Sequence, residues 1–387
     1  MTNQDLLQIA EEFGTPVYVY DADSIKSQYE KLTTSFAEST KFFYACKSLT
    51  NINILKYVEK LGANLDCVSI NEVKLGLKAG FSAERILFTP NCVDLAEIEE
   101  AMALNVHINI DNISILEQFG TKYGDSYPVF LRINPHIFAG GNYKISTGHI
   151  DSKFGISIHQ MRHIERVMKS TNLNIEGLHM HTGSEIKDPE VFLQGLEIMF
   201  ELSESFPNLK YIDMGSGFKV PYQKGELETD VKALGKKVEK AVTQFKKETG
   251  KDFELWFEPG KYLVSKSGHF LVKSNVIKQT TATVFVGVNS GFNHLIRPMF
   301  YDSYHVIENL TNPKGTERIY TVVGNICETD TFAWDRKLHE VREGDVLVFR
   351  NAGAYGFEMS SNFNSRLKPA EVLFLDGKAH LIRKREE

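Results

Sequence analysis

Short apolar runs alternate along the first two thirds of the chain with longer segments in which apolar positions follow a helical period. After the first run, Ile54, Leu55, Val58 and Leu61 recur at a spacing that places them on one face of a helix. The apolar runs of strand length cover residues 41–46, 63–68, 85–89, 106–110, 128–134, 175–181, 210–214 and 253–257. Eight such alternations, with no glycine-rich dinucleotide fingerprint after the first strand, favour a (β/α)8 barrel of the TIM type over a doubly wound sheet.

The pattern changes after residue 268, where strand-like runs follow one another without long helices between them. These runs cover residues 270–278, 282–288, 319–324, 345–349, 371–375 and 380–382. Turn signals such as Asn312-Pro313 and Asp376-Gly377 bound them, so we predict an all-β C-terminal domain, a sandwich or a barrel. A further strand-like run at 16–20 falls outside the eight and is expected to join that domain.

The sequence therefore predicts three parts. Residues 1–22 form an N-terminal segment that packs with the β domain, residues 23–265 form the barrel, and residues 266–387 form the C-terminal β domain. A chain of 387 residues, 42% apolar and 24% charged, is long enough for two domains that each bury a core.

Charge and composition exclude several functional classes. The net charge of −6 and the absence of a basic cluster argue against nucleic acid as a partner, which leaves small molecules. No run approaches the roughly 18 apolar residues of a membrane helix, so no membrane association is expected. The first 14 residues form an acidic amphipathic pattern without the features of an export signal, and the four cysteines lack metal or disulfide spacing; both favour a cytoplasmic protein.

Candidate chemical groups follow the ends of four predicted barrel strands. Lys47 follows the first strand, His181 and Ser184 follow the sixth, the Gly-Ser-Gly turn at 215–217 follows the seventh, and Glu258 follows the eighth. In barrels of this type the active site lies at the carboxyl ends of the strands. The sequence therefore brings these groups to one end of the barrel.

Each of these groups also has a simpler structural interpretation. A lysine at a strand exit most often extends to water, although an apolar wall such as Phe42 and Phe43 would lower its pKa toward nucleophilic use. Two alternate histidines, His179 and His181, have a spacing that could bind zinc, but no third ligand stands nearby in the sequence, so no metal is expected. The run at 178–184 is better explained if one histidine faces a planar cofactor and Ser184 lies near a phosphate.

The remaining groups complete the requirements of one cofactor. The turn at 215–217 lets backbone N–H groups approach an anion, and Glu258 in Glu258-Pro259-Gly260 ends an apolar strand, where a buried carboxylate needs a partner. A pyridinium N–H is such a partner. With Lys47 as the covalent anchor and Cys327 as a proton donor, these groups suit an enzyme that uses pyridoxal 5'-phosphate (PLP).

The motifs in combination resemble a known family. They are Tyr-Ala-Cys-Lys-Ser at 44–48, Ser-Lys-Phe-Gly-Ile at 152–156, His-Thr-Gly-Ser at 181–184, Glu-Pro-Gly at 258–260, Ile-Arg-Pro at 296–298, Tyr-Asp-Ser-Tyr-His at 301–305, Cys-Glu-Thr-Asp at 327–330 and Ala-Tyr-Gly at 354–356. From residue 15 to 382 the chain is similar to the PLP-dependent amino acid decarboxylases of alanine-racemase-like fold, and within them to the branch that acts on diaminopimelate.

This resemblance implies roles for the residues. Lys47 would bind the cofactor covalently, His181 would stack on its ring and Glu258 would keep the ring nitrogen protonated. Further contacts to the cofactor would come from Ser184, Gly217, Pro259, Gly260, Lys261 and Tyr355. Members of the family are generally homodimers with shared active sites, which implies that Cys327 and Glu328 serve the partner's Lys47.

The same resemblance implies a substrate. Diaminopimelate carries an amino acid group at each end, and the end that does not react needs a cation for its carboxylate. Arg297 offers a guanidinium fork, and Tyr301, Glu328, Lys261 and Tyr355 would complete the substrate contacts. We therefore expect decarboxylation of meso-2,6-diaminopimelate to L-lysine and carbon dioxide. The chain departs from the family pattern at Lys261, where the family has arginine, at Ser216, where it has glycine, and in the barrel loops at 69–72 and 88–91.

Three alternatives remain open at this point. A related PLP decarboxylase of carboxynorspermidine, ornithine or lysine would differ at Arg297, Tyr301 and Glu328. An amino acid racemase of the same fold would need a second base opposite the lysine, for which Tyr355 is the candidate, and would leave Cys327 without a role. A non-enzymatic binding protein should have lost the lysine, the ring-nitrogen carboxylate or the thiol, and all three are present.

Overall fold

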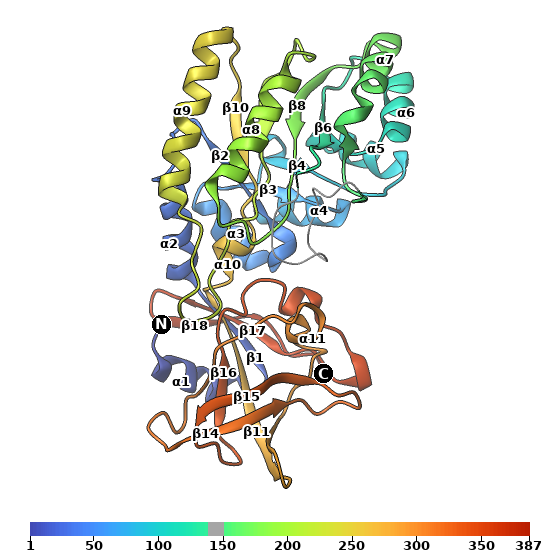
Figure 1. The fold of residues 1–387 in the computed structure, drawn as a ribbon. Coiled ribbons are helices and arrows are strands. Elements are labelled where there is room, and N and C mark those ends of the chain that lie inside the picture. The colour runs from blue at the N-terminus through green and yellow to red at the C-terminus, as the bar shows by residue number, and fades with distance from the viewer. Residues whose placement is uncertain (138–150) are drawn as a thin grey trace.

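A computed structural model describes residues 1–137 and 151–387 of the chain, and its upper half is a closed barrel of parallel strands (Figure 1). The barrel strands are β2 (Lys41–Ala45), β3 (Asn64–Cys67), β4 (Ile86–Phe88), β5 (His107–Ile110), β6 (Val129–Asn134), β8 (Ile175–His179), β9 (Tyr211–Asp213) and β10 (Glu254–Phe257). The barrel closes because β10 pairs with β2 and β5 pairs with β6. All eight predicted strands are confirmed. A two-residue strand, β7 (Ile156–Ser157), pairs with β6 beside the barrel.

Helices surround the barrel (Figure 1). They are α2 (Ala22–Thr33), α3 (Ile52–Lys60), α4 (Ile70–Ala79), α5 (Leu95–Ala103), α6 (Ile113–Tyr123), α7 (Met161–Thr171), α8 (Pro189–Ser203), α9 (Val231–Thr249) and the short α10 (Lys261–Val264). Several begin at a side chain that accepts a backbone N–H of the first turn, as Asn51, Ser69, Asp94 and Asn112 do. Such caps satisfy N–H groups that the helix itself leaves unpaired, so the sequence sets these starts locally.

Aromatic side chains fill part of the barrel interior. Phe43, Leu87, Phe130 and Trp256 form a buried cluster of their own. The rings of Phe130 on β6 and Trp256 on β10 lie 5.1 Å apart although these two strands do not pair, so the contact crosses the barrel. This packing makes the barrel a solid core and not a pore, and it leaves the ends of the strands as the place for chemistry.

The lower half of the molecule is a second sheet (Figure 1). Its strands are β1 (Val17–Asp21), β11 (Gly268–Gln279), β12 (Val284–Val288), β13 (Ile307–Asn309), β14 (Glu317–Val323), β15 (Thr331–His339), β16 (Val346–Phe349), β17 (Ala370–Leu375) and β18 (Lys378–Arg383). The N-terminal strand β1 lies between β11 and β17, so the prediction that it joins this domain is confirmed. The helix α1 (Asn3–Phe13) packs Leu6 and Ile9 against the same core.

Two strands and a one-turn helix of this domain were not predicted from the sequence. Strand β13 has three residues, too few to show an alternating pattern. Strand β15 contains the charged run Asp335, Arg336 and Lys337 and owes its place to antiparallel pairing with β14 across a bulged register. The helix α11 (Arg297–Tyr301) interrupts a domain that was expected to be all β. The domain limits at residues 22 and 265 stay a prediction.

Helices able to cross a lipid bilayer, judged by length and apolar character, do not occur in the described part of the chain.

Candidate active site

Lys47 lies immediately after barrel strand β2, in a single 3-10 turn, Cys46–Ser48. Its Nζ donates to Oδ2 of Asp66, 2.9 Å away at the end of β3, and Asp66 is buried. Burial lowers the pKa of Lys47, but the charges of Asp66 and Glu258 outweigh burial, so the pKa is raised above its usual value. The expectation that the apolar strand lowers this pKa was therefore wrong, because the carboxylates that face the amine come from other strands.

The predicted groups converge around Lys47. The pocket is lined by Ala45, Lys47, His181, Gly183, Ser184, Ser216, Gly217, Phe218, Glu258, Gly260, Lys261, Tyr262 and Tyr355. Pro259 adjoins it and accepts a hydrogen bond from the backbone N–H of Ala45 at 3.2 Å. Four barrel strands and one loop of the β domain thus meet at one site. Arg297, Tyr301, Cys327 and Glu328 are not among the lining residues.

Glu258 has one carboxylate oxygen occupied and one without a partner. Oε2 lies 3.1 Å from Nε2 of the fully buried His179, while Oε1 is buried without any hydrogen bond. Burial raises the pKa of Glu258, and the positive charges of Lys47 and Arg132 oppose that rise. A buried carboxylate oxygen without a donor is costly, so this geometry fits a ligand that brings an N–H group, as a protonated pyridine ring does.

The two histidines differ in their contacts. His181 Nδ1 accepts the backbone N–H of Ser216 at 3.2 Å, and burial together with the charge of Arg132 holds its pKa well below the usual value. The hydrogen bond at one edge fixes the orientation of the His181 ring. Burial also holds the pKa of His179 well below its usual value, and its Nε2 lies within hydrogen-bond distance of Glu258 Oε2.

The expectation that no third metal ligand stands near the two histidines was wrong. Ligand atoms of His179, Asp213 and Glu258 lie within 4.8 Å of one another, so further ligand types do stand near the first histidine. His181, the other half of the zinc spacing, is not part of this group among the described residues.

Three buried charged residues of the site were missed in the sequence, namely Asp66, Arg132 and Asp213, each within or directly ending a barrel strand. His179 was considered there only as half of a zinc pair, and its contact with Glu258 was not predicted. Arg132 acts electrostatically on Glu258, Asp66, His179 and His181, and the pKa of Asp213 is raised by burial and by Glu258. A charged residue inside an otherwise apolar strand was the available signal.

The glycine turn after β9 leaves no space for larger residues. A Cβ on Gly217, whose φ is +110°, would lie 2.3 Å from the carbonyl oxygen of Gly183. A Cβ on Gly215, with φ +60°, would lie 2.6 Å from His181 Nδ1. Ser216 between them is not among the residues with positive φ, so the serine fits the turn without backbone strain. The turn therefore keeps its backbone open to an anion.

Lys261, at a position where the family has arginine, belongs to a small cluster of ion pairs. Its Nζ forms an ion pair with Glu185, and Glu185 also lies 3.2 Å from Nζ of Lys219. Burial, and secondarily the charge of Arg297, lowers the pKa of Lys261 to about 7. Lys261 therefore offers a single point charge near neutrality and not a permanent fork.

Arg297 lies on α11, within a cage of aromatic rings. Its guanidinium carbon lies 5.2 Å from the ring centre of Tyr222, 5.9 Å from Tyr301 and 6.0 Å from Tyr355. The side chain is 6% exposed, its Nε has no partner, and Nη2 donates only to Ser303 at 3.3 Å. Among the described residues no carboxylate forms an ion pair with this buried cation.

Cys327 and Glu328 lie apart from this pocket. Both are exposed on the loop between β14 and β15. Cys327 is held at Asn364, which accepts the Cys327 backbone N–H at 2.8 Å and donates to its Sγ at 3.2 Å. Within one chain, therefore, the thiol does not join the groups around Lys47.

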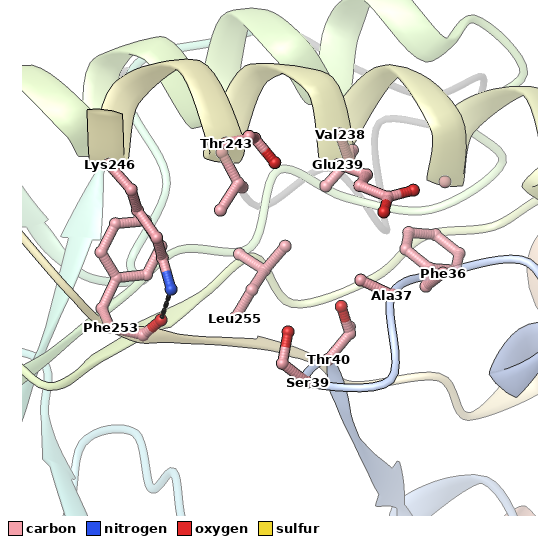
Figure 2. Close-up of a pocket in the computed structure, with 12 residues that line it drawn as sticks. Phe36, Ala37, Ser39, Thr40, Val238, Glu239, Thr243, Lys246, Phe253 and Leu255 are labelled. Atoms are coloured by element: carbon pink, nitrogen blue, oxygen red, sulfur yellow. Dashed lines mark hydrogen bonds between the residues drawn. The ribbon is translucent and has the colours of Figure 1, made fainter. Parts of the chain in front are cut away.

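A second hollow lies at the opposite ends of the strands, between α9 and the segments that precede β2 and β10 (Figure 2). Phe36, Val238, Phe253 and Leu255 form its apolar wall, and Lys246 donates to the carbonyl of Phe253. None of the groups that converge at Lys47 lines this hollow, and a barrel's amino end is a place for stability more than for catalysis.

Comparisons with known proteins agree with this geometry. The family model of the pyridoxal-dependent decarboxylases, pyridoxal binding domain, matches residues 22–265. The diaminopimelate decarboxylases of Methanothermobacter thermautotrophicus and of Escherichia coli K12 are 36% and 34% identical to this chain, and the alignments cover 99% and 100% of it and 92% and 95% of the relatives. The crystal structure of diaminopimelate decarboxylase from Helicobacter pylori complexed with L-lysine matches with a TM-score of 0.91 and 31% identity, over 100% of this chain and 97% of that one.

Proposed function

The chain belongs to the pyridoxal-dependent decarboxylases, and we propose that within this family it decarboxylates meso-2,6-diaminopimelate to L-lysine. The main support for this substrate comes from Arg297. Its buried guanidinium has no carboxylate partner among the described residues and lies next to the pocket residue Tyr355. A buried charge without a counter-ion is costly unless a ligand supplies one. A substrate with a second carboxylate would do so.

The residues of the pocket fit PLP. Lys47 would hold it covalently, the free Oε1 of Glu258 would accept its ring N–H, and the turn at Gly217 with Ser184 would receive its phosphate. Bound PLP supplies an electron sink that accepts the pair left behind when carbon dioxide departs. The protein's residues would orient the cofactor and the substrate and supply the protons.

Glu258 is proposed to hold a proton on the ring nitrogen. His179 would fix the carboxylate through Oε2, which leaves the buried Oε1 without a hydrogen-bond partner in the chain. The charges of Lys47 and Arg132 favour the ionised carboxylate against the effect of burial. An ionised carboxylate next to a pyridine nitrogen favours the protonated ring by direct charge attraction.

Arg297 and Lys261 are proposed to face the end of the substrate that does not react. The ring of Tyr222 lies 5.2 Å from the guanidinium of Arg297 and 6.0 Å from Nζ of Lys261, so both cations share one wall. Arg297 would grip the distal carboxylate, and Tyr301 and Tyr355 would limit its position. The Helicobacter pylori relative was crystallised with L-lysine, the product proposed here.

A homodimer with shared sites is part of the proposal. Cys327 and Glu328 are exposed and absent from their own chain's pocket, yet the reaction needs a proton donor after carbon dioxide leaves. A second copy that brings this loop to Lys47 would complete the site. Cys327 Sγ would then deliver its proton to the carbon that lost carbon dioxide, and Glu328 would contact the distal ammonium.

The substrate assignment is tested by measuring carbon dioxide release from meso-diaminopimelate, L-lysine and L-ornithine. We expect diaminopimelate to be preferred, and Arg297→Leu to lower kcat/KM for it by roughly 10- to 150-fold, the value of a charge-assisted hydrogen bond. The matched control is Arg318→Leu, an exposed arginine of the same domain. Preference for lysine or ornithine, or racemised diaminopimelate without carbon dioxide, would overturn the assignment.

Replacement of the thiol tests the proton donor. We expect Cys327→Ala to retain the cofactor's visible absorbance while kcat falls by roughly 10²- to 10⁴-fold, the usual contribution of a general acid. Refolding a mixture of Cys327→Ala and Lys47→Ala chains should restore activity that neither variant shows, because one site of each mixed dimer is intact. A wild-type rate and product from Cys327→Ala would remove the thiol from the mechanism.

A further inference from the structure

The backbone just after Lys47 is held by the β domain. Tyr355 donates its backbone N–H to the carbonyl of Ser48 at 2.9 Å, and Asn51 Nδ2 donates to Glu371 Oε2 at 2.8 Å. Between these two contacts lies Thr50, which meets the carboxylate of Glu358. The segment that follows the reactive lysine is therefore positioned by a domain other than the one that contains the lysine.

Glu358 holds Thr50 with both carboxylate oxygens. Oε1 accepts the backbone N–H of Thr50 at 2.8 Å and Oε2 accepts its Oγ1 hydroxyl at 2.5 Å. Burial raises the pKa of Glu358, and the two donors of Thr50 oppose that rise. Among the described residues no lysine or arginine forms an ion pair with Glu358, so Thr50 is the only partner that these hydrogen bonds give it.

Glu371, which contacts Asn51 next to Thr50, has a different role. It is fully buried and accepts from Tyr20 at 2.7 Å, Asn51 at 2.8 Å and Arg383 at 2.5 Å. With three partners in three elements, Glu371 anchors the fold. Glu358, by contrast, holds one residue, Thr50, and it lies three positions after the pocket residue Tyr355.

We propose that Glu358 is a positioning residue for Lys47, acting through Thr50; the inference rests on Lys47 being the cofactor-binding lysine of the proposed function. The two-point contact fixes the peptide three residues beyond Lys47, while Asp66 fixes Nζ itself. Displacement of a reacting group by about 1 Å costs on the order of 10²-fold in rate, so loss of this contact should act on chemistry more than on binding.

The test compares Glu358→Gln and Thr50→Val with their double variant in the full-length protein. Hydrogen–deuterium exchange of residues 46–54 is measured without cofactor, and the pH titration of the cofactor's visible band, kcat and KM are measured with it. Both single variants should exchange faster in this segment, shift the band's titration, and lower kcat about tenfold or more with KM changed less than twofold. Both single variants weaken the same two-point contact, so the effect of the double variant should be smaller than the sum of the two single effects.

Two controls separate positioning from general stability. Thr50→Ser keeps both donors to Glu358 and should behave as wild type, and Glu343→Gln changes an exposed carboxylate of the same domain. If Glu358→Gln does not fold, the comparison of Thr50→Val with Thr50→Ser tests the proposal by itself. Wild-type exchange and titration in Thr50→Val, or additive effects in the double variant, would overturn the proposal.

The outcome does not depend on the substrate. If the wild-type protein binds the cofactor but does not decarboxylate diaminopimelate, the substrate assignment fails while the exchange and titration measurements still decide the role of Glu358. If the wild-type protein binds no cofactor, the proposed function fails, and a positioning role for Lys47 fails with it.

Discussion

Lys47→Ala is expected to abolish decarboxylation, with kcat lowered by roughly 10³-fold or more, because the covalent anchor of the cofactor is lost. The variant should bind PLP weakly and lack the visible absorbance of the wild-type protein. After borohydride reduction, peptide mass analysis should find the cofactor on Lys47 in the wild-type protein and on no lysine in the variant.

Lys47→Arg separates the covalent role from the electrostatic one. Arginine keeps the positive charge beside Asp66, whose Oδ2 lies 2.9 Å from Nζ in the wild-type protein, but cannot bind the cofactor's aldehyde. We expect it to be as inactive as Lys47→Ala. Lys41→Ala, at the exposed opposite end of the same strand, is the matched control and should retain activity. Substantial turnover in Lys47→Ala would contradict the entire assignment of the site.

Glu258→Gln is expected to lower kcat by roughly 10²- to 10³-fold, the range found when one preorganised electrostatic group is removed from a reaction site. A glutamine amide still bonds to its neighbours but carries no charge to hold a proton on the ring nitrogen, so the cofactor becomes a weaker electron sink. The cofactor should remain attached to Lys47, so its visible band should persist while carbon dioxide release falls.

The control for this variant lies on the same strand. Glu254→Gln changes an exposed carboxylate at the start of β10, where the side chain accepts from the indole of Trp256 at 3.1 Å. It should leave turnover within about twofold of wild type, since surface substitutions have small effects. If Glu258→Gln retained wild-type turnover with bound cofactor, the pyridine nitrogen would need no proton from this residue, and the free Oε1 would need another explanation.

Several residues of the site could be predicted from their positions in the sequence. Lys47, His181 and Glu258 were predicted because each follows an apolar strand, and the carboxyl ends of barrel strands meet at one place. The environment of each group was not predictable in this way. The pKa of Lys47 is shifted in the opposite direction to the expectation, because the charges of Asp66 on β3 and of Glu258 just after β10 act on the amine.

Contacts between residues that lie far apart in the sequence were the hardest to predict. His179 contacts Glu258 across 79 positions, and Thr50 contacts Glu358 across 308. Local pattern carries no information about such pairs, because they depend on which strand ends and loops come together. The strand β15 was missed for the same reason, since its charged run is stabilised by pairing with β14 and not by its own periodicity.

The sequence by itself determined the elements that depend on local rules: eight strands buried on both faces, helices that begin at capping side chains, and groups of distinct chemistry at strand ends. The tertiary structure alone decided the electrostatics and the partners of those groups, such as the free oxygen of Glu258 and the uncompensated charge of Arg297. Charges interact through space over several ångströms, and only the closed barrel and the β domain beneath it bring them within that range.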